Sequence, residues 1–187
     1  MAVAPARWPD QAVLDWMVDH RDPVVTDIVT AITTVGSTGG VALATIAVAV
    51  WFVTRGARPH ALALVVTMLL GWGLMNALKY TFRRDRPPLP ERLVDISTFS
   101  FPSGHAMMSA MFAAAVVCAL ARMDLPRKRT RAAAAVVTAA SLLIGFSRVY
   151  LGAHWLTDVV AGWALGAAFG AAGIVLVLRL ISARAGR

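Results

Sequence analysis

The sequence predicts an all-α protein, a polytopic bundle of membrane-spanning helices. Hydrophobic residues make up 58% of the 187 residues, only 15% are charged, and the mean hydropathy is +0.68. A soluble domain is ordinarily nearer half apolar and a quarter charged. Five apolar runs account for the difference, and each is near the ~20 residues that cross a bilayer. We therefore expect about five transmembrane helices, at approximately residues 38–54, 60–79, 104–122, 131–148 and 155–179.

The last apolar run carries a stripe of small residues. Gly162, Gly166 and Gly170 recur at four-residue spacing, which places them on one face of a helix and lets a neighbouring helix approach closely. We expect this face to pack inside the bundle. The alternative use of such a stripe is a dimer interface.

Residues 1–36 are less hydrophobic and predict amphipathic helices. Asp22-Pro23 has the form of an N-cap followed by the first helical residue. Beyond it, apolar side chains recur at a spacing of about 3.6 residues with a polar face opposite. Such helices lie along the membrane surface or across the bundle. The alternative is that 23–36 forms a short sixth span. The chain thus divides into an N-terminal segment, 1–36, and a transmembrane domain, 37–187.

Cationic side chains and a Ser-Gly turn stand at the ends of the apolar runs. Arginine offers paired N–H donors that match phosphate oxygens, and lysine adds a point charge. Lys79, Arg86 and Arg148 therefore suit a dense negative group such as a phosphate. Ser103-Gly104 precedes the third run, where a serine N-cap and a helix N-terminus present donors to an anion. We expect Ser103 and Gly104 to contact the same phosphate.

Two histidines and one carboxylate complete a set that can attack phosphorus. His154 and Asp158 are four residues apart, which would place them on one face of a helix. The carboxylate can accept the Nδ1 proton and leave Nε2 of His154 as a nucleophile that forms a phosphohistidine. His105 is then the general acid for the leaving oxygen. The cations supply the positive charge, so the chemistry requires no metal or other cofactor.

Each motif taken alone has a structural alternative. Lys79 and the charged run 83–86 could simply end a membrane helix, 102–104 could be an ordinary turn and cap, and His154 with Asp158 could be a structural pair. A zinc site at His105, His154 and Asp158 is a further alternative, with no additional ligand cluster to support it. All three motifs would nevertheless meet at one end of the bundle, and their joint occurrence favours a functional site.

These motifs together resemble the signature of the type-2 phosphatidic acid phosphatase superfamily, which also includes vanadium-dependent haloperoxidases and glucose-6-phosphatase. The match is complete at the defined positions of Lys79-x6-Arg86-Pro87, Pro102-Ser103-Gly104-His105 and Ser147-Arg148-x5-His154-x3-Asp158. The resemblance implies a membrane bundle with His154 as nucleophile, His105 as acid and Asp158 as its orienting partner. It also implies Lys79, Arg86, Ser103, Gly104 and Arg148 as phosphate ligands.

The charge distribution predicts an orientation in the membrane. Ten of the 18 cations follow the first, third and fifth apolar runs. The other eight lie at the opposite ends, and three of them are assigned to phosphate. Ten cations on one side therefore compare with five on the other. The positive-inside rule then places the C-terminus in the cytoplasm and the active site outside. The formal charge of +8 is explained by this topology and by anionic lipids, without a nucleic-acid partner.

The resemblance is strongest to small bacterial members of the superfamily, enzymes of the plasma membrane that act on undecaprenyl diphosphate, phosphatidylglycerophosphate or phosphatidic acid. We expect a metal-independent phosphatase of a membrane lipid, with a polyprenyl diphosphate cleaved to the monophosphate and inorganic phosphate as the leading substrate. The alternatives within the class are phosphatidylglycerophosphate, phosphatidic acid or a phosphorylated decaprenyl-phosphoryl sugar. The alternatives outside this class are a haloperoxidase-like vanadate binder and a lipid-binding or transport protein without turnover.

Overall fold

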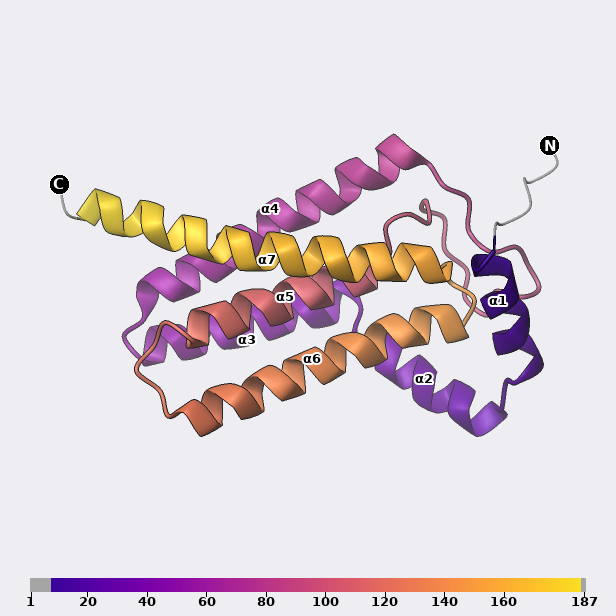
Figure 1. The fold of residues 1–187 in the computed structure, drawn as a ribbon, viewed down its shortest axis with the longest axis horizontal. Coiled ribbons are helices and arrows are strands. Elements are labelled where there is room, and N and C mark those ends of the chain that lie inside the picture. Colours follow the sequence, from indigo (N-terminus) through magenta and orange to yellow (C-terminus); the bar gives the residue numbers. More distant parts are fainter. Residues whose placement is uncertain (1–7, 186–187) are drawn as a thin grey trace.

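The computed structural model describes residues 8–185, and this range contains seven α-helices and no strand (Figure 1). The prediction of an all-α bundle is confirmed. Arg7 and Arg187, which enter the charge comparison, lie outside the described residues, as does the start of the segment 1–36. The helices are α1 (Asp10–Asp19), α2 (Pro23–Val35), α3 (Thr38–Thr54), α4 (Arg58–Phe82), α5 (Gly104–Leu120), α6 (Arg127–Tyr150) and α7 (Leu156–Ala185).

The centre of the bundle is α5, which packs against α3, α4, α6 and α7. More than half of its side chains are buried, including those of Met107 and Met111. Phe52 of α3, Leu64 of α4 and Ile174 of α7 close the same core. Because α5 is hydrophobic all round, it can be enclosed by other helices, and that is where it lies.

The glycine stripe of α7 packs inside the bundle, as predicted, and its partner there is α5. A Cβ added at Gly166 would lie 2.1 Å from the carbonyl oxygen of Met107, and one at Gly170 would lie 2.3 Å from that of Met111. At Gly162 the nearest atom would be the carbonyl oxygen of Ser103, at 2.9 Å. These are backbone atoms that cannot rotate away. The two helices therefore approach so closely only because the stripe has no side chains.

Three described helices are long and apolar enough to cross a membrane, namely α4, α6 and α7. A fourth span is formed if α2 and α3, which meet at a 53° bend, are taken together. This is fewer than the five expected from the apolar runs, because α3 and α5 have only 17 residues each. All five runs are helical, but the central helix, α5, is shorter than α4, α6 and α7.

The N-terminal helices cover one end of the bundle. Asp22 caps α2 as predicted, with its carboxylate accepting from the backbone N–H groups of Val24 and Val25 at 2.9 and 3.0 Å. A separate sixth span at 23–36 is too short, since 13 residues give a helix of about 20 Å against a hydrocarbon core of about 30 Å. Val29 and Thr33 are buried on the inner face of α2, which packs against α6.

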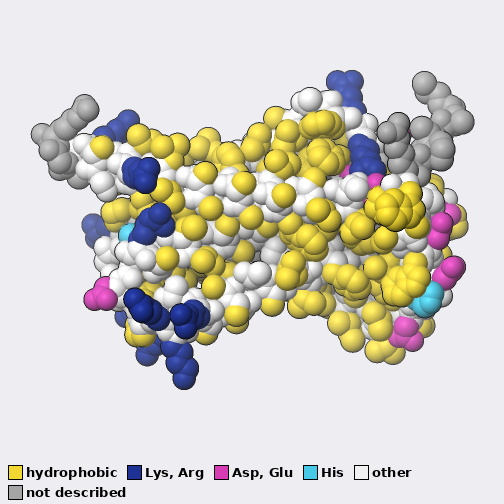
Figure 2. Space-filling view, viewed as in Figure 1, with side chains coloured by type: hydrophobic (Ala, Val, Ile, Leu, Met, Phe, Trp, Pro, Cys, Tyr) yellow, Lys and Arg dark blue, Asp and Glu magenta, His cyan; other side chains and the backbone are white. Residues whose placement is uncertain are grey.

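The outer surface is that of a membrane protein. Figure 2 shows hydrophobic side chains over the middle of the visible face, with charged groups gathered toward the two ends. Leu43, Leu69, Val136 and Leu176 are among the large hydrophobic residues that are more than half exposed. Exposed apolar surface of this extent requires a lipid environment, so the protein is a multi-pass membrane protein.

Substitution at the α5–α7 contact should destabilise the fold. We expect Gly166→Ala to lower the thermal unfolding temperature in detergent micelles, because the new Cβ would force the helices apart. Gly73→Ala in α4 is the matched control, since a Cβ there has no atom within 4 Å, and alanine favours a helix over glycine. Equal unfolding temperatures for the two variants would contradict the role of the stripe.

Candidate active site

Two connections at one end of the bundle carry the motif residues. The longer one, residues 83–103, joins α4 to α5 after Arg83 ends α4 in the left-handed conformation, with φ of 47°. The shorter one joins α6 to α7 through Gly152, whose φ is 64°. A Cβ at Gly152 would lie 2.5 Å from the carbonyl oxygen of Glu91, so the turn that leads to His154 depends on glycine for both conformation and space.

A cavity of about 200 Å³ lies between these connections and the helix ends. Six of the eight predicted site residues line it: Lys79, Arg86, Gly104, His105, Arg148 and His154. The two imidazoles therefore share one cavity although they are 49 positions apart in sequence. Asp158 lies behind His154, and Ser103 is buried beside Gly104. The structure thus brings together the residues that the three motifs singled out.

Backbone carbonyl groups hold two of the cations in place. Lys79 Nζ donates to the carbonyl oxygens of Phe99 and Pro102, at 2.7 and 2.9 Å. The Arg86 guanidinium donates to the carbonyl oxygens of Thr98 and Ala153, at 2.7 and 2.6 Å. Burial and, secondarily, Arg92 lower the pKa of Arg86 to about 10, so it remains charged at neutral pH. Neither cation has a carboxylate partner among the described residues.

Two further polar groups in this region have unused hydrogen-bonding capacity. Arg148 is buried and donates through one terminal nitrogen to the hydroxyl of Thr33, but its Nε has no partner in the described part of the chain. Ser103 occupies the N-cap position of α5 as expected, yet within residues 8–185 its hydroxyl makes no cap bond and no other hydrogen bond. Buried donors without partners are costly, and an anion in the cavity would provide the acceptor.

His154 precedes α7 rather than lying on a helix, which corrects the prediction that it shares a helix face with Asp158. The helix begins at Leu156, and the backbone N–H of His154 donates to the carbonyl oxygen of Arg148. The expected pair nevertheless forms, with Nδ1 3.5 Å from Asp158 Oδ2. Nε2 is on the other side, 3.0 Å from Arg86. Burial, reinforced by Arg86, lowers the pKa of His154 well below 6.5 and keeps the ring neutral.

Asp158 has partners that the sequence motifs do not contain. Ser100 donates its hydroxyl proton to Oδ2, and the backbone N–H of Trp155 donates to the same oxygen at 3.1 Å. Arg84 donates to the other oxygen, Oδ1, at 2.6 Å. The carboxylate has no exposed surface, and its arginine partner is Arg84, so it forms no ion pair with Lys79, Arg86 or Arg148.

Arg84 also connects the carboxylate to the N-terminal helix. Its second terminal nitrogen donates to Asp10 Oδ2 at 2.6 Å, and Asp10 accepts from the backbone N–H and the hydroxyl of Thr157 at 2.9 and 2.7 Å. The guanidinium lies over the ring of Trp155, 5.7 Å from its centroid. Sequence reasoning missed Arg84, Ser100 and Asp10. The only signal for Arg84 was its place in the charged run 83–86.

Ser147 of the third motif has a local role, because it donates its hydroxyl to the carbonyl oxygen of Ile144 within α6.

The described residues contain no group of three or more histidine, cysteine or acidic side chains arranged to hold a metal ion, so the zinc alternative gains no support.

Comparison with known proteins places the chain in a family. Residues 60–182 match the PAP2 superfamily. Phosphatidylglycerophosphatase B of Bacillus subtilis is 33% identical over 163 residues, covering 84% of this chain and 77% of that protein. Undecaprenyl-diphosphatase of Sulfolobus acidocaldarius is 28% identical over 123 residues, covering 63% of this chain and 55% of that protein.

Solved structures have the same fold. A transmembrane PAP2-type phosphatidylglycerolphosphate phosphatase from Bacillus subtilis superimposes with a TM-score of 0.79 at 26% identity, covering 94% of this chain and 85% of that one. Aquifex aeolicus LpxE gives a TM-score of 0.72 at 21% identity, covering 92% of this chain and 99% of that one. The chain belongs to the PAP2 superfamily. It is a membrane lipid phosphatase, a hydrolase of phosphoric esters.

The contacts of Arg84 generate a kinetic prediction. We expect Arg84→Ala to lower kcat on the order of 10²-fold, because an altered position of Asp158 misplaces the imidazole, while KM changes little. Arg84→Lys, which can restore one charged contact, should recover part of kcat. Arg83→Ala is the matched control, since Arg83 is exposed and donates only to the carbonyl oxygen of Tyr80. A loss confined to KM would contradict the role in orientation.

Proposed function

We propose that the enzyme hydrolyses a lipid diphosphate at the membrane surface, with a polyprenyl diphosphate as its substrate and the monophosphate and inorganic phosphate as products. One observation carries the proposal: Lys79, Arg86 and Arg148 face a single cavity, and within the described residues none has a carboxylate partner. Three uncompensated cations suit the charge of a diphosphate better than that of a monoester. The position of the cavity, at the helix ends, suits a head group whose tail remains in lipid.

Phosphatidylglycerophosphate is the second candidate, and a specific observation favours it. The curated relative with 33% identity is a phosphatidylglycerophosphatase, whereas the undecaprenyl-diphosphatase is 28% identical. A monoester of this kind would occupy the same cavity and undergo the same chemistry. The two substrates therefore differ in the leaving group and in the tail, and only rates can rank them.

The first chemical step transfers the phosphoryl group to His154. The Nδ1 atom carries the proton and lies toward Asp158, so Nε2 has its lone pair toward the cavity. Nε2 forms a bond to phosphorus while the bond from phosphorus to the leaving oxygen breaks. His105, at the start of α5 on the cavity wall, donates a proton to that oxygen. The product of this step is a phosphohistidine and the dephosphorylated or shortened lipid.

The second step returns the enzyme to its starting state. Water attacks the phosphohistidine, His105 accepts the proton from that water, and the phosphorus–nitrogen bond breaks to release inorganic phosphate. Lys79, Arg86 and Arg148 stabilise the charge on the non-bridging oxygens in both steps. Ser103 and the backbone of Gly104 supply further donors at the N-terminus of α5. With this positive charge in place, hydrolysis proceeds without a metal ion.

The N-terminal segment 1–36 contributes positioning residues to the transmembrane domain 37–187. Asp10 holds Arg84, and Arg84 with Ser100 fixes both oxygens of Asp158. Thr33 receives a hydrogen bond from Arg148 and fixes its guanidinium. The family match begins only at residue 60. Asp10 and Thr33, which hold Arg84 and Arg148, therefore lie outside the matched region.

The cavity faces the extracytoplasmic side of a bacterial plasma membrane, with the C-terminus in the cytoplasm. The uneven distribution of cations supports this orientation through the positive-inside rule. Such an orientation suits an enzyme that recovers a lipid carrier after its cargo has been transferred outside the cell.

Replacement of the nucleophile tests the chemistry. We expect His154→Ala to lower the rate of phosphate release from polyprenyl diphosphate micelles by about four orders of magnitude or more. Vanadate should inhibit the parent enzyme, and EDTA should leave its rate largely intact. The matched control is His20→Ala, which removes an exposed histidine that does not line the cavity. Near-normal turnover in His154→Ala would eliminate this residue as nucleophile, and loss of activity in EDTA with rescue by Mg²⁺ would contradict the metal-free step.

The same assay ranks the substrates. Polyprenyl diphosphate should give a higher kcat/KM than phosphatidylglycerophosphate or phosphatidic acid at equal mole fraction in micelles. A clear preference for phosphatidylglycerophosphate would replace the diphosphate proposal by the second candidate and leave the mechanism unchanged.

A labelling experiment tests the orientation. A cysteine at Leu89, which is 66% exposed in the 83–103 connection, should react with a membrane-impermeant thiol reagent in intact cells after Cys118→Ala. A cysteine at Asp124, exposed at the opposite end of the bundle, should react only after lysis. The reverse pattern would invert the proposed topology.

A further inference from the structure

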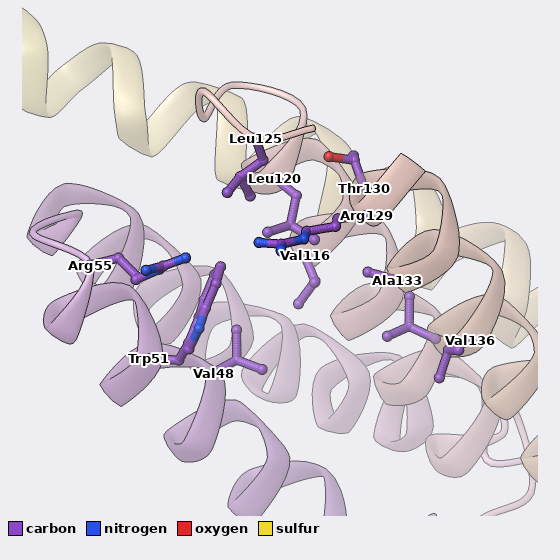
Figure 3. A pocket seen from close by; sticks show the side chains of 11 residues that line it. Val48, Trp51, Arg55, Val116, Leu120, Leu125, Arg129, Thr130, Ala133 and Val136 are labelled. Carbon is purple, nitrogen blue, oxygen red and sulfur yellow. The ribbon is translucent and has the colours of Figure 1, made fainter. Parts of the chain in front are cut away.

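A second groove lies at the end of the bundle opposite the catalytic cavity. The two sites are at opposite ends of α5, whose 17 residues separate them by about 25 Å. The groove has a volume of about 380 Å³ and is lined by α3, by the end of α5 and by the first three turns of α6 (Figure 3). It shares no residue with the catalytic cavity.

The groove exists because α5 keeps α3 and α6 apart. Both helices pack against α5, and their direct contact with each other is minor at most. Val116 and Leu120 of α5 line the groove between Val48 and Trp51 on one side and Ala133 and Val136–Val137 on the other. Almost all of this lining is hydrocarbon. A linear apolar chain fits a surface of this chemistry.

Two guanidinium groups stand at the end of the groove. Figure 3 shows Arg55 from the end of α3 and Arg129 from the first turn of α6 on facing walls. Neither forms an ion pair with any described carboxylate. Arg55 lies over Trp51, with its central carbon 5.7 Å from the ring centroid, which keeps the cation beside the apolar wall. The N-terminus of α6 adds partial positive charge at the same place.

We propose that this groove binds an anionic phospholipid of the bilayer, with one acyl chain along the apolar walls and the head-group phosphate between Arg55 and Arg129. Cationic pockets between helices at a membrane surface attract anionic head groups. The chemistry disfavours a second copy of this chain as the occupant, because the same end also carries Arg58, Arg122, Arg127, Lys128 and Arg131, and the like charges of two copies would repel. Such a lipid would brace α3 against α6 without entering the catalytic cavity.

The experiment uses lipids whose acyl chains carry bromine, which quenches nearby tryptophan fluorescence. The full-length enzyme in detergent, with vanadate in the catalytic cavity, is titrated with brominated phosphatidylglycerol or brominated phosphatidylcholine. The groove signal is the part of the quenching that Trp51→Phe removes. We expect it to saturate at a concentration on the order of tenfold lower for the anionic lipid than for the zwitterionic one.

A pair of double variants separates a built site from general surface charge. Arg55→Gln/Arg129→Gln should abolish the preference for phosphatidylglycerol and the rise in unfolding temperature that this lipid causes. The control, Arg58→Gln/Lys128→Gln, changes the net charge equally at neighbouring exposed positions that do not line the groove, and it should keep both. The proposal is wrong if the first variant keeps the preference or if the control loses it equally. It is also wrong if the lipid-free enzyme is a dimer in light scattering and gives no groove signal.

Discussion

The site depends on positive charge that the chain keeps uncompensated inside an apolar bundle. Lys79 and Arg148 are 7% and 3% exposed, and ionised side chains at such depth are costly unless polar groups surround them. The chain supplies carbonyl and hydroxyl oxygens, from Phe99 and Pro102 for the lysine and from Thr33 for the arginine. These neutral acceptors hold the cations without cancelling their charge. The cavity therefore keeps the positive charge that the proposed phosphate substrate requires.

The same requirement explains how the carboxylate is arranged. If a cation of the cavity balanced the charge of Asp158, that cation could no longer bind the proposed phosphate. Arg84 takes this role instead and lies on the side of Asp158 away from His154, bonded to Oδ1 while Oδ2 faces the imidazole. In the proposed mechanism, one oxygen of this carboxylate thus orients the ring, while the other oxygen pairs with Arg84. Asp10 and Thr157 in turn keep the guanidinium in position.

Close helix packing converts these local contacts into one cavity. His105 lies in the first turn of α5 and Asp158 in the first turn of α7, so their separation depends on how closely those two helices approach. The glycine stripe brings the backbones together, and the backbone N–H of Ser103 donates to the carbonyl oxygen of Asp158 at 3.0 Å. At the other end, α3 and α6 diverge around α5 and leave an apolar groove with two arginines at its mouth. One central helix therefore shapes both ends of the molecule.

The sequence by itself determined the helical class, the apolar runs, the Asp22 cap, the glycine face of α7 and the eight residues proposed for phosphate chemistry. These follow from local rules: helix periodicity, capping, and residue types that suit a phosphate at a motif's fixed spacing. The one geometric error of the sequence analysis in the site was to extend α7 back to His154, where Gly152 makes a turn instead.

Only the tertiary structure decided the partners of those residues. Arg84, Ser100 and Thr33 contact them across 54 to 115 positions of sequence, and Asp10 reaches Arg84 across 74. No spacing rule connects groups that far apart. Which of these residues meet depends on which helix ends lie next to one another when the helices pack around α5.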